Sequence, residues 1–305
     1  MKYIIFFIMA FPLFSSQWQV KNISLLTEND ADFRTDRDYT YGSEIGILYQ
    51  IKKNEYYSFS IAHQMYTPSD IEADNIDFTK EKPYAGYMYI GGGYHKVNDD
   101  TLDSYNIQIG FVGPSVKMDE VQKMIHSIIG SPEPKGWDEQ IGDELILQFN
   151  YEKRFITSLS DLGSFSQDMI YYGGVNIGNA STKLSFGGTY IFGNFQCDNF
   201  GIDKIDYRGY NVIPRDEDLL QKRHLYNFFL TFEANIVARD IFLDGNTFKD
   251  SVNVDKEVFV LKGGFGISYR YEHFLLAYLH TFSSKEFKTQ DYYHGYGSFY
   301  IGYNF

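Results

Sequence analysis

The sequence is dominated by short segments in which apolar and polar residues alternate, and this pattern limits the fold more than any other feature. Strict alternation indicates β-strands, and alternating segments of roughly ten residues between turns are typical of transmembrane β-barrels. By this template we count about twelve candidate strands. They lie near residues 18–27, 39–51, 55–67, 84–97, 104–113, 141–156, 167–178, 183–193, 224–238, 257–271, 273–284 and 295–305. We therefore expect an all-β chain, a transmembrane antiparallel β-barrel of about twelve strands.

The last candidate strand, Gly295–Phe305, favours a bacterial outer membrane. It reads GYGSFYIGYNF, and an aromatic residue at the end of the closing strand resembles the C-terminal signature of outer-membrane barrels. An even strand number lets both chain ends face the periplasm. The outer loops are then expected at 28–38, 68–83, 114–140, 239–256 and 285–294. The connection 194–223 is long yet falls on the periplasmic side, so either the count fails there or the barrel has an inner segment.

The amino-terminal residues predict export. A short apolar run, Tyr3–Phe14, follows Lys2 and precedes Ser15, which is the plan of a secretory signal peptide. The run is too short for a transmembrane helix, which needs about 20 apolar residues. We expect residues 1–16 to be the signal peptide and residues 17–305 to form the barrel, with an active site at its rim.

Composition excludes several other classes of protein. The chain has 27 Lys and Arg against 40 Asp and Glu, a net charge of −13, and no basic block, which argues against nucleic acid as a partner. The single cysteine excludes a disulfide framework and a cysteine-cluster zinc site. We expect a monomer. A soluble secreted β-sandwich or lectin-like barrel would also alternate, and it is the alternative fold.

One short helix is predicted inside an outer loop. Met118–Gly130 reads MDEVQKMIHSIIG, with apolar residues at helical spacing and Gly130 as a C-cap. Gln122 and His126 are four residues apart and therefore share one helix face. A lone histidine on a small helix is more often structural, but histidine is also the common switchable base near neutral pH.

Polar residues at the outer end of the first hairpin suggest chemistry beside that helix. Asn29 and Asp30 end the first strand and Thr40 starts the second, which brings an amide, a carboxylate and a hydroxyl together. Asn29 and Asp30 carry oxygen ligands of the kind that Ca²⁺ prefers. The aspartates between them and the second strand are interpreted as turn formers, namely Asp32, Asp36 and Asp38.

These features together predict a hydrolase without a protein nucleophile. His126 would take a proton from water, and Ca²⁺ would stabilise the oxyanion of the tetrahedral intermediate. The sequence contains neither a G-x-S-x-G elbow nor an H-E-x-x-H zinc motif, which agrees with this scheme.

Several ordered blocks resemble a known family, the outer-membrane lipid A 3′-O-deacylases of the LpxR type. The blocks are NDADFRTDRDYTYG (29–42), QMYTPSD (64–70), EKPYAGYMY (81–89), GFVGPSVKMDEVQKMIHSIIG (110–130), GWDEQIGDE (136–144) and the closing aromatic strand. The resemblance implies a twelve-stranded barrel with its active site at the outer rim, between barrel wall and helix. It also implies Ca²⁺-dependent hydrolysis of the 3′-linked acyloxyacyl ester of lipid A, with lipopolysaccharide in the outer membrane as substrate.

The family's site residues carry over by motif. Asn29 and Asp30 match an Asn-Asp pair at the metal and oxyanion region, Thr40 matches a threonine that positions substrate or the metal shell, and His126 matches the general base. The family also uses an acidic residue shortly after the helix. The direct alignment gives Pro132 there, so the resemblance assigns the catalytic and metal-binding role to Glu133, one place later.

Two further residues are expected to contact substrate, Gln122 on the helix and Lys82 in the second outer loop. Family members can carry a basic stretch in that loop, suited to substrate phosphate. This chain instead has Glu72, Ala73 and Asp74 at that place, which departs from the family pattern.

Two other functions stay open from the residues alone. One is a passive barrel, either a small pore or a surface-binding protein without catalysis. The other is a serine-type barrel phospholipase, which needs a Ser beside a His on one face of the wall. Ser60 and His63 are three apart in a strand and point to opposite faces. A serine on a neighbouring strand is not excluded by sequence.

Overall fold

The described part of the chain begins just after the predicted signal peptide. The computed structural model describes residues 18–30, 35–73, 75–163, 165–194, 197–202, 204–205, 212–215 and 224–305. The predicted signal peptide, residues 1–16, and the predicted turn former Asp32 lie outside the described residues.

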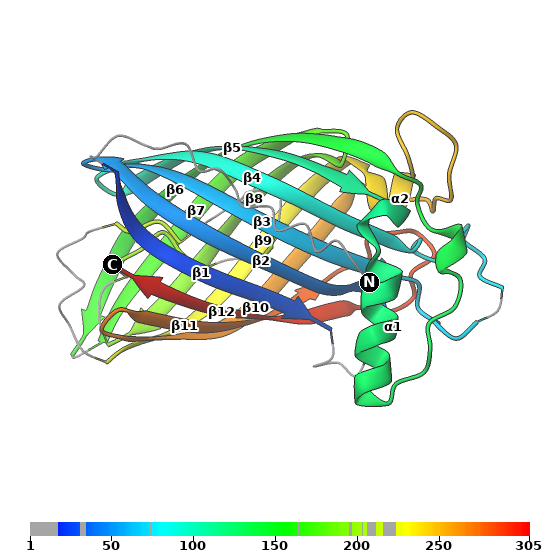
Figure 1. Ribbon diagram of the computed structural model, residues 1–305. Coiled ribbons are helices and arrows are strands. Elements are labelled where there is room, and N and C mark those ends of the chain that lie inside the picture. The colour runs from blue at the N-terminus through cyan, green and yellow to red at the C-terminus, as the bar shows by residue number, and fades with distance from the viewer. Residues whose placement is uncertain are drawn as a thin grey trace.

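The described residues form one closed antiparallel barrel (Figure 1). Each strand pairs with its neighbours in the sequence, and β1 closes the barrel by pairing with β12 from Asn22↔Asn304 to Asn29↔Gly297. The twelve described strands are β1 (Gln19–Asn29), β2 (Asp38–Lys52), β3 (Glu55–Thr67), β4 (Ala85–Asn98), β5 (Thr101–Val112), β6 (Glu144–Leu162), β7 (Phe165–Gly178), β8 (Ser181–Gly193), β9 (Leu225–Asp240), β10 (Phe259–Tyr271), β11 (Phe274–Ser283) and β12 (His294–Asn304). The predicted strand number and antiparallel order are confirmed.

The faces of the strands distinguish a membrane barrel from a soluble one. In β5 the exposed positions are Tyr105, Ile107, Ile109 and Phe111, whereas Ser104, Asn106 and Gln108 are buried in the lumen. Apolar residues outside and polar residues inside are the arrangement of a barrel surrounded by lipid. A soluble sandwich or lectin-like barrel would bury the apolar face instead. The alternative fold is therefore excluded.

The two ends of the barrel differ in their connections. We call the end where β1 finishes and β2 begins the loop end, and the opposite end the turn end. At the loop end the chain crosses through the short turn 179–180 and through five longer connections, 30–37, 68–84, 113–143, 241–258 and 284–293, which match the five predicted loops. Two helices lie there, α1 (Met118–Ile129) and the one-turn α2 (Ile241–Asp244) (Figure 1). Among the described residues, no helix is long and apolar enough to cross a membrane.

The long connection after β8 enters the lumen from the turn end. Phe200 and Ile213 in it are completely buried. Arg154 of β6 donates from Nη1 to Phe200 O at 2.7 Å, and the backbone N–H of Ile205 donates to Glu28 Oε1 of β1 at 3.0 Å. Of the two explanations offered for the long connection 194–223, the inner segment is therefore correct for its described part, and the number of strands stays at twelve.

Helix α1 lies outside the barrel wall, at the loop end. Its first residue, Met118, packs on Gly86 of β4, where a Cβ atom would stand 2.8 Å from Met118 Cγ. A small apolar core joins helix, loops and wall; it contains Met65, Phe78, Tyr84, Met118 and Trp137. Met65 belongs to the outward face of β3, so this core fixes α1 against the outer surface of the barrel and not over its mouth.

Candidate functional site

A cavity of about 580 Å³ lies between α1 and the outer wall. We call it the wall cavity. Its polar lining includes Asn29, Asp30, Asp36, Thr40, Gln122 and His126, and its apolar lining includes Tyr41, Met65, Ile71, Ile125 and Ile129. Five of the predicted site residues therefore meet at one place, although they come from three separate segments of the chain.

The helix turns its polar face toward the wall because the polar residues there have partners. Gln122 and His126 are buried, and they are one helical turn apart. Gln122 Nε2 lies 3.1 and 3.2 Å from the two carboxylate oxygens of Asp36, and its Oε1 accepts from Trp137 Nε1 at 2.7 Å. Since both ends of its amide are engaged by protein atoms, Gln122 holds Asp36 in place. The structure gives it a positioning contact, where the sequence predicted a substrate contact.

His126 is held between two oxygen atoms. Its Nε2 lies 2.8 Å from Asp36 Oδ2, and its Nδ1 lies 2.5 Å from the backbone carbonyl oxygen of Pro132. A carbonyl oxygen can only accept, so Nδ1 carries a hydrogen. Burial raises the pKa of Asp36, and the neighbouring His126 and Gln122 lower it, with a net increase. Asp36 and His126 therefore share one hydrogen, which lies between Nε2 and Oδ2.

Thr40 is tied to the same loop. Its Oγ1 lies 2.7 Å from Thr67 Oγ1 across the β2–β3 pair, and Thr67 Oγ1 donates to the backbone carbonyl of Asp36 at 3.0 Å. The hydroxyl predicted to position substrate or metal is thus one step from the backbone of Asp36. This network fixes Asp36 on the outer side of the wall.

Asn29 and Asp30 lie beside the Asp36–His126 pair and suit a hard cation. Asp30 is 1 % exposed, and its Oδ2 accepts from Thr35 Oγ1 and from the backbone N–H of Arg37, both at 2.9 Å. Burial raises the pKa of Asp30 to about 8. Within the described ranges no Lys or Arg side chain pairs with it, and an oxygen-rich site without a neutralising side chain is what Ca²⁺ prefers. The same part of the chain holds no group of three or more His, Cys, Asp or Glu placed to bind a metal.

Two predicted residues lie elsewhere. Glu133 is exposed and does not line the wall cavity, because the chain turns there so that the carbonyl of Pro132 faces His126. Lys82 is buried inside the lumen, where its Nζ contacts Glu286 Oε2 at 2.7 Å. It lines a separate, smaller cavity, so the structure does not bring Lys82 to the site at which a substrate contact was predicted.

Asp36 is the site residue that the sequence argument missed. It was interpreted as a turn former, yet its Oδ2 lies 2.8 Å from His126 Nε2. The run Asp36-Arg37-Asp38 at the start of β2 was the available signal for a carboxylate here, but residues two apart in a regular strand share a face, so periodicity does not separate the two aspartates. Asp38 has a left-handed φ of 61°, which breaks the alternation at this point. Only the position of α1 decides which of the two aspartates meets the histidine.

A Ser–His pair does exist across neighbouring strands, but inside the barrel. Ser58 Oγ of β3 lies 2.8 Å from His95 Nε2 of β4, and Ser104 Oγ lies 3.0 Å from His95 Nδ1. His95 has no exposed surface and Ser58 is 3 % exposed. A serine-type phospholipase needs the pair on a surface that lipid can reach, so this pair does not support that function.

Comparison with known proteins places the chain in a family. The family described as outer membrane protein LpxR matches residues 3–305. LpxR from Salmonella typhimurium has the same fold, with a TM-score of 0.79 and 20 % identity over 93 % of this chain and 100 % of that chain. The β domain of the Bordetella autotransporter Brka gives a TM-score of 0.45 at 10 % identity over 93 % and 98 % of the two chains, too low for argument. No curated protein sequence matches. With nearly its whole length matched, the chain belongs to the LpxR family of outer membrane proteins.

Proposed function

We propose that this protein is a lipid A 3′-O-deacylase that hydrolyses the 3′-linked acyloxyacyl ester in the outer membrane. The observation that carries the proposal is the Asp36–His126 contact of 2.8 Å in a cavity on the outer face of the wall. A base in the lumen would meet water and small solutes, whereas a base on this face meets the lipid that surrounds the barrel.

The lining of the wall cavity suits an amphiphilic ester. Met65, Ile71, Ile125 and Ile129 offer apolar surface, and the proton-sharing pair lies among them. An ester carbonyl at the junction of an acyl chain and a sugar would place its apolar and polar parts against matching surfaces. The acidic lining and the absence of a basic stretch at 72–74 favour a substrate whose phosphates bind elsewhere or through cations.

The chemistry assigned to this chain is proton transfer during hydrolysis. A water oxygen attacks the ester carbonyl carbon while its proton passes to the Asp36–His126 pair, which accepts it after releasing the shared proton to solvent. When the carbonyl re-forms, the bond to the 3′ oxygen breaks, and the pair returns the proton to that oxygen. In the resting geometry both ring nitrogens of His126 face acceptors. Asp36 therefore takes part as one half of the base, and His126 does not act alone.

Ca²⁺ is proposed as the cofactor, with Asn29 and Asp30 as the residues that would hold it. When bound, Ca²⁺ would supply positive charge to stabilise the oxyanion of the tetrahedral intermediate. Asp30 fits this role because it is a buried carboxylate whose charge is costly without a cation. Glu133 is not proposed as a ligand, since it is exposed and does not line the cavity.

A passive pore is the competing function. The described part of the inner segment speaks against it, because Phe200 and Ile213 fill space in the lumen. Conductance of the purified protein in a planar bilayer tests this alternative directly, and a steady pore-sized conductance would favour it.

The decisive experiment for the enzyme is mass spectrometry of lipid A incubated with refolded protein. We expect loss of one acyloxyacyl mass with Ca²⁺ and no change with chelator. His126→Ala is the matched variant, and it should leave lipid A intact while the barrel remains folded. An unchanged spectrum with the active protein, a 3′-acylated substrate and Ca²⁺ would overturn the proposal.

A further inference from the structure

Helix α1 exposes a second apolar surface that the wall cavity does not use. Met124 and Ile128 are 57 % and 75 % exposed, and neither lines the cavity. Isolated exposed apolar residues are common on protein surfaces. These two, however, lie one helical turn apart and form a continuous flank together with the half-buried Val121.

The direction of this flank follows from the contacts of His126. His126 points to Asp36, which lies beyond the start of β2 at the loop end. Met124 and Ile128 are each two residues from His126, which corresponds to about 200° around the helix axis. They therefore lie on the side of the helix opposite His126 and the wall cavity, next to Val121, which packs on the small apolar core at the wall. Lys123 and Ser127, both exposed, lie between the two flanks.

The zone beside the strand faces is already an apolar surface. On the outer wall below the wall cavity, Ile23 and Leu25 of β1 and Ile45 of β2 are exposed, as are Met88 and Ile90 of β4. α1 is seated on this wall through Met118 and Gly86. The flank of α1 thus lies next to the lipid-facing surface of the barrel, and the lipid that covers this surface also reaches the helix.

We propose that α1 is an interfacial helix whose flank of Met124 and Ile128 is immersed in the acyl chains of the surrounding bilayer. Helices with one apolar and one charged flank lie in the plane of the interface, with the apolar side about 5–10 Å deep in the boundary. The exposed charged residues Glu120 and Lys123 then remain at the headgroup level. This docking does not depend on the hydrolysis proposed above.

Site-directed spin labelling of the full chain in phosphatidylethanolamine–phosphatidylglycerol vesicles tests the proposal. The native Cys197 is buried, and a Cys197→Ser background avoids labelling it. Nitroxides are placed through Met124→Cys and Ile128→Cys, with Lys123→Cys as the matched control on the charged flank. We expect collisions with oxygen to exceed those with a water-soluble nickel chelate several-fold at 124 and 128, and the reverse at 123.

Two outcomes would overturn the proposal. Equal nickel accessibility at 123, 124 and 128 would mean that the flank lies in water. Strong spin–spin broadening at 124 and 128 would mean that a second copy of the chain covers them. Loss of the β-sheet circular dichroism spectrum shows that a labelled variant has unfolded. If Met124→Cys or Ile128→Cys unfolds, the accessibility measured at the other of these two positions tests the proposal. Because no turnover is measured, failure here is distinct from failure of the proposed enzyme activity.

Discussion

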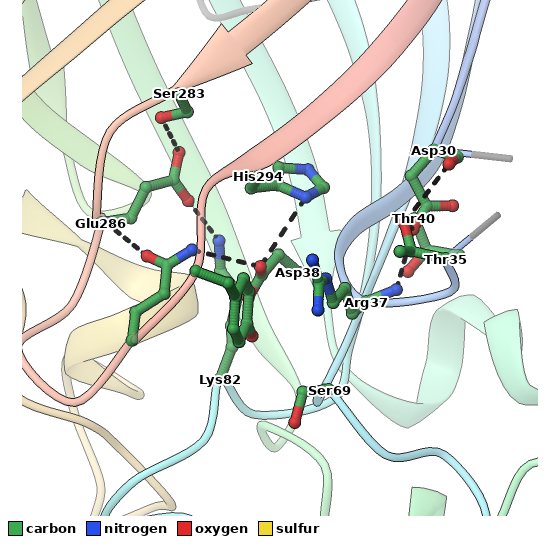
Figure 2. Close-up of polar contacts among 12 residues, drawn as sticks. Asp30, Thr35, Arg37, Asp38, Thr40, Ser69, Lys82, Ser283, Glu286 and His294 are labelled. Atoms are coloured by element: carbon green, nitrogen blue, oxygen red, sulfur yellow. Dashed lines mark hydrogen bonds and ion pairs between the residues drawn. The ribbon is translucent and has the colours of Figure 1, made fainter. Parts of the chain in front are cut away.

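Two aspartates in one short loop have opposite surroundings, and the contrast separates the reactive part of the molecule from the structural part. Asp36 points outward and contacts His126 and Gln122 in the wall cavity. Asp38, two residues later, is 1 % exposed and points into the lumen. Figure 2 shows the divide, with Asp30, Thr35 and Thr40 on one side of Arg37 and the cluster around Asp38 on the other.

The lumen side holds a cluster of buried charges around two lysine–glutamate pairs. We call Asp38, Lys82, Glu286 and His294 the lumen cluster. Gln290 Nε2 and Tyr292 OH each lie 3.4 Å from Asp38, and His294 Nδ1 lies 3.7 Å from it. Glu286 pairs with Lys82 at 2.7 Å and with Lys262 at 3.2 Å. Two lysines thus neutralise Glu286, whereas burial raises the pKa of Asp38 to about 7.

The wall side has carboxylates without such cations and an opening to the surroundings. Burial raises the pKa of Asp30 and of Asp36, and among the described residues no Lys or Arg side chain pairs with either of them. A carboxylate paired with a lysine stabilises the fold, whereas a buried carboxylate without such a partner can bind a proton or an external cation and take part in chemistry. The comparison makes five predictions, which follow from the largest expected effect to the smallest.

Removing either half of the proton-sharing pair should abolish most activity. His126→Ala and Asp36→Asn each should lower the deacylation rate by about 10²–10⁴-fold, the usual contribution of a general base. The rate is measured by mass spectrometry of lipid A at fixed times. Asp38→Asn is the matched control, the same change two residues away on the lumen side. If Asp38→Asn lost as much activity as Asp36→Asn at unchanged stability, the division between the two sides would be wrong.

Removing a lumen charge should affect stability instead. Lys82→Met leaves Glu286 and Asp38 buried with less neutralising charge, and should cost about 3–5 kcal/mol of unfolding free energy. Urea unfolding in detergent micelles, followed by circular dichroism, measures the loss. Lys288→Met removes an exposed pair with Asp255, with side chains 62 % and 79 % exposed, and should cost below about 1 kcal/mol. Equal losses would contradict the structural role of the lumen cluster.

Ca²⁺ should stabilise the protein through the wall cavity. A cation bound only by the folded state adds about 2.7 kcal/mol at a concentration 100 times its dissociation constant. The thermal midpoint should therefore rise with Ca²⁺ and return with chelator. Asp30→Asn should remove most of this rise, whereas Glu133→Gln should retain it. An undiminished rise in the Asp30 variant would place the cation elsewhere.

The stability that the Lys82–Glu286 pair contributes should stay constant between about pH 5 and 9. Glu286 has a pKa well below its ordinary value because Lys82 and Lys262 offset its burial, so its contribution is lost only as pH falls through that lowered pKa. The pKa of Lys82 is raised by Glu286 and Asp38 against the effect of burial, so its contribution is lost only above the ordinary lysine range. Asp38 adds a change inside this window, because burial raises its pKa to about 7 and Lys82 lowers it. Charged Asp38 needs Lys82 more than protonated Asp38 does, so the cost of Lys82→Met should grow as pH rises through about 7. A cost that fell as pH rose through this range would contradict the assigned contacts.

The smallest effect is expected at Glu133. Its side chain is exposed and outside the cavity lining, so Glu133→Gln should change the deacylation rate by no more than about twofold. A loss comparable to that of His126→Ala would show that substrate brings Glu133 into the site.

The sequence by itself determined the barrel, because side-chain alternation is a local property that each strand carries. The twelve strands start and end within a few residues of their predicted limits, apart from β6, which extends to Leu162 where 156 was predicted. That extension comes from pairing with β7 down to Leu162↔Phe165, which no local pattern records. The helix and its Gly130 cap were likewise local, and Gly130 does adopt a left-handed φ of 74°.

The tertiary structure alone decided which polar residues meet. Asn29, Asp30, Thr40 and His126 were brought together as the family motif implied. The partner of His126, the lumen position of Lys82 and the exclusion of Glu133 all depend on where α1 rests on the wall. That position is set by a small apolar core drawn from three segments, and contacts between distant segments leave no periodic signal in the sequence.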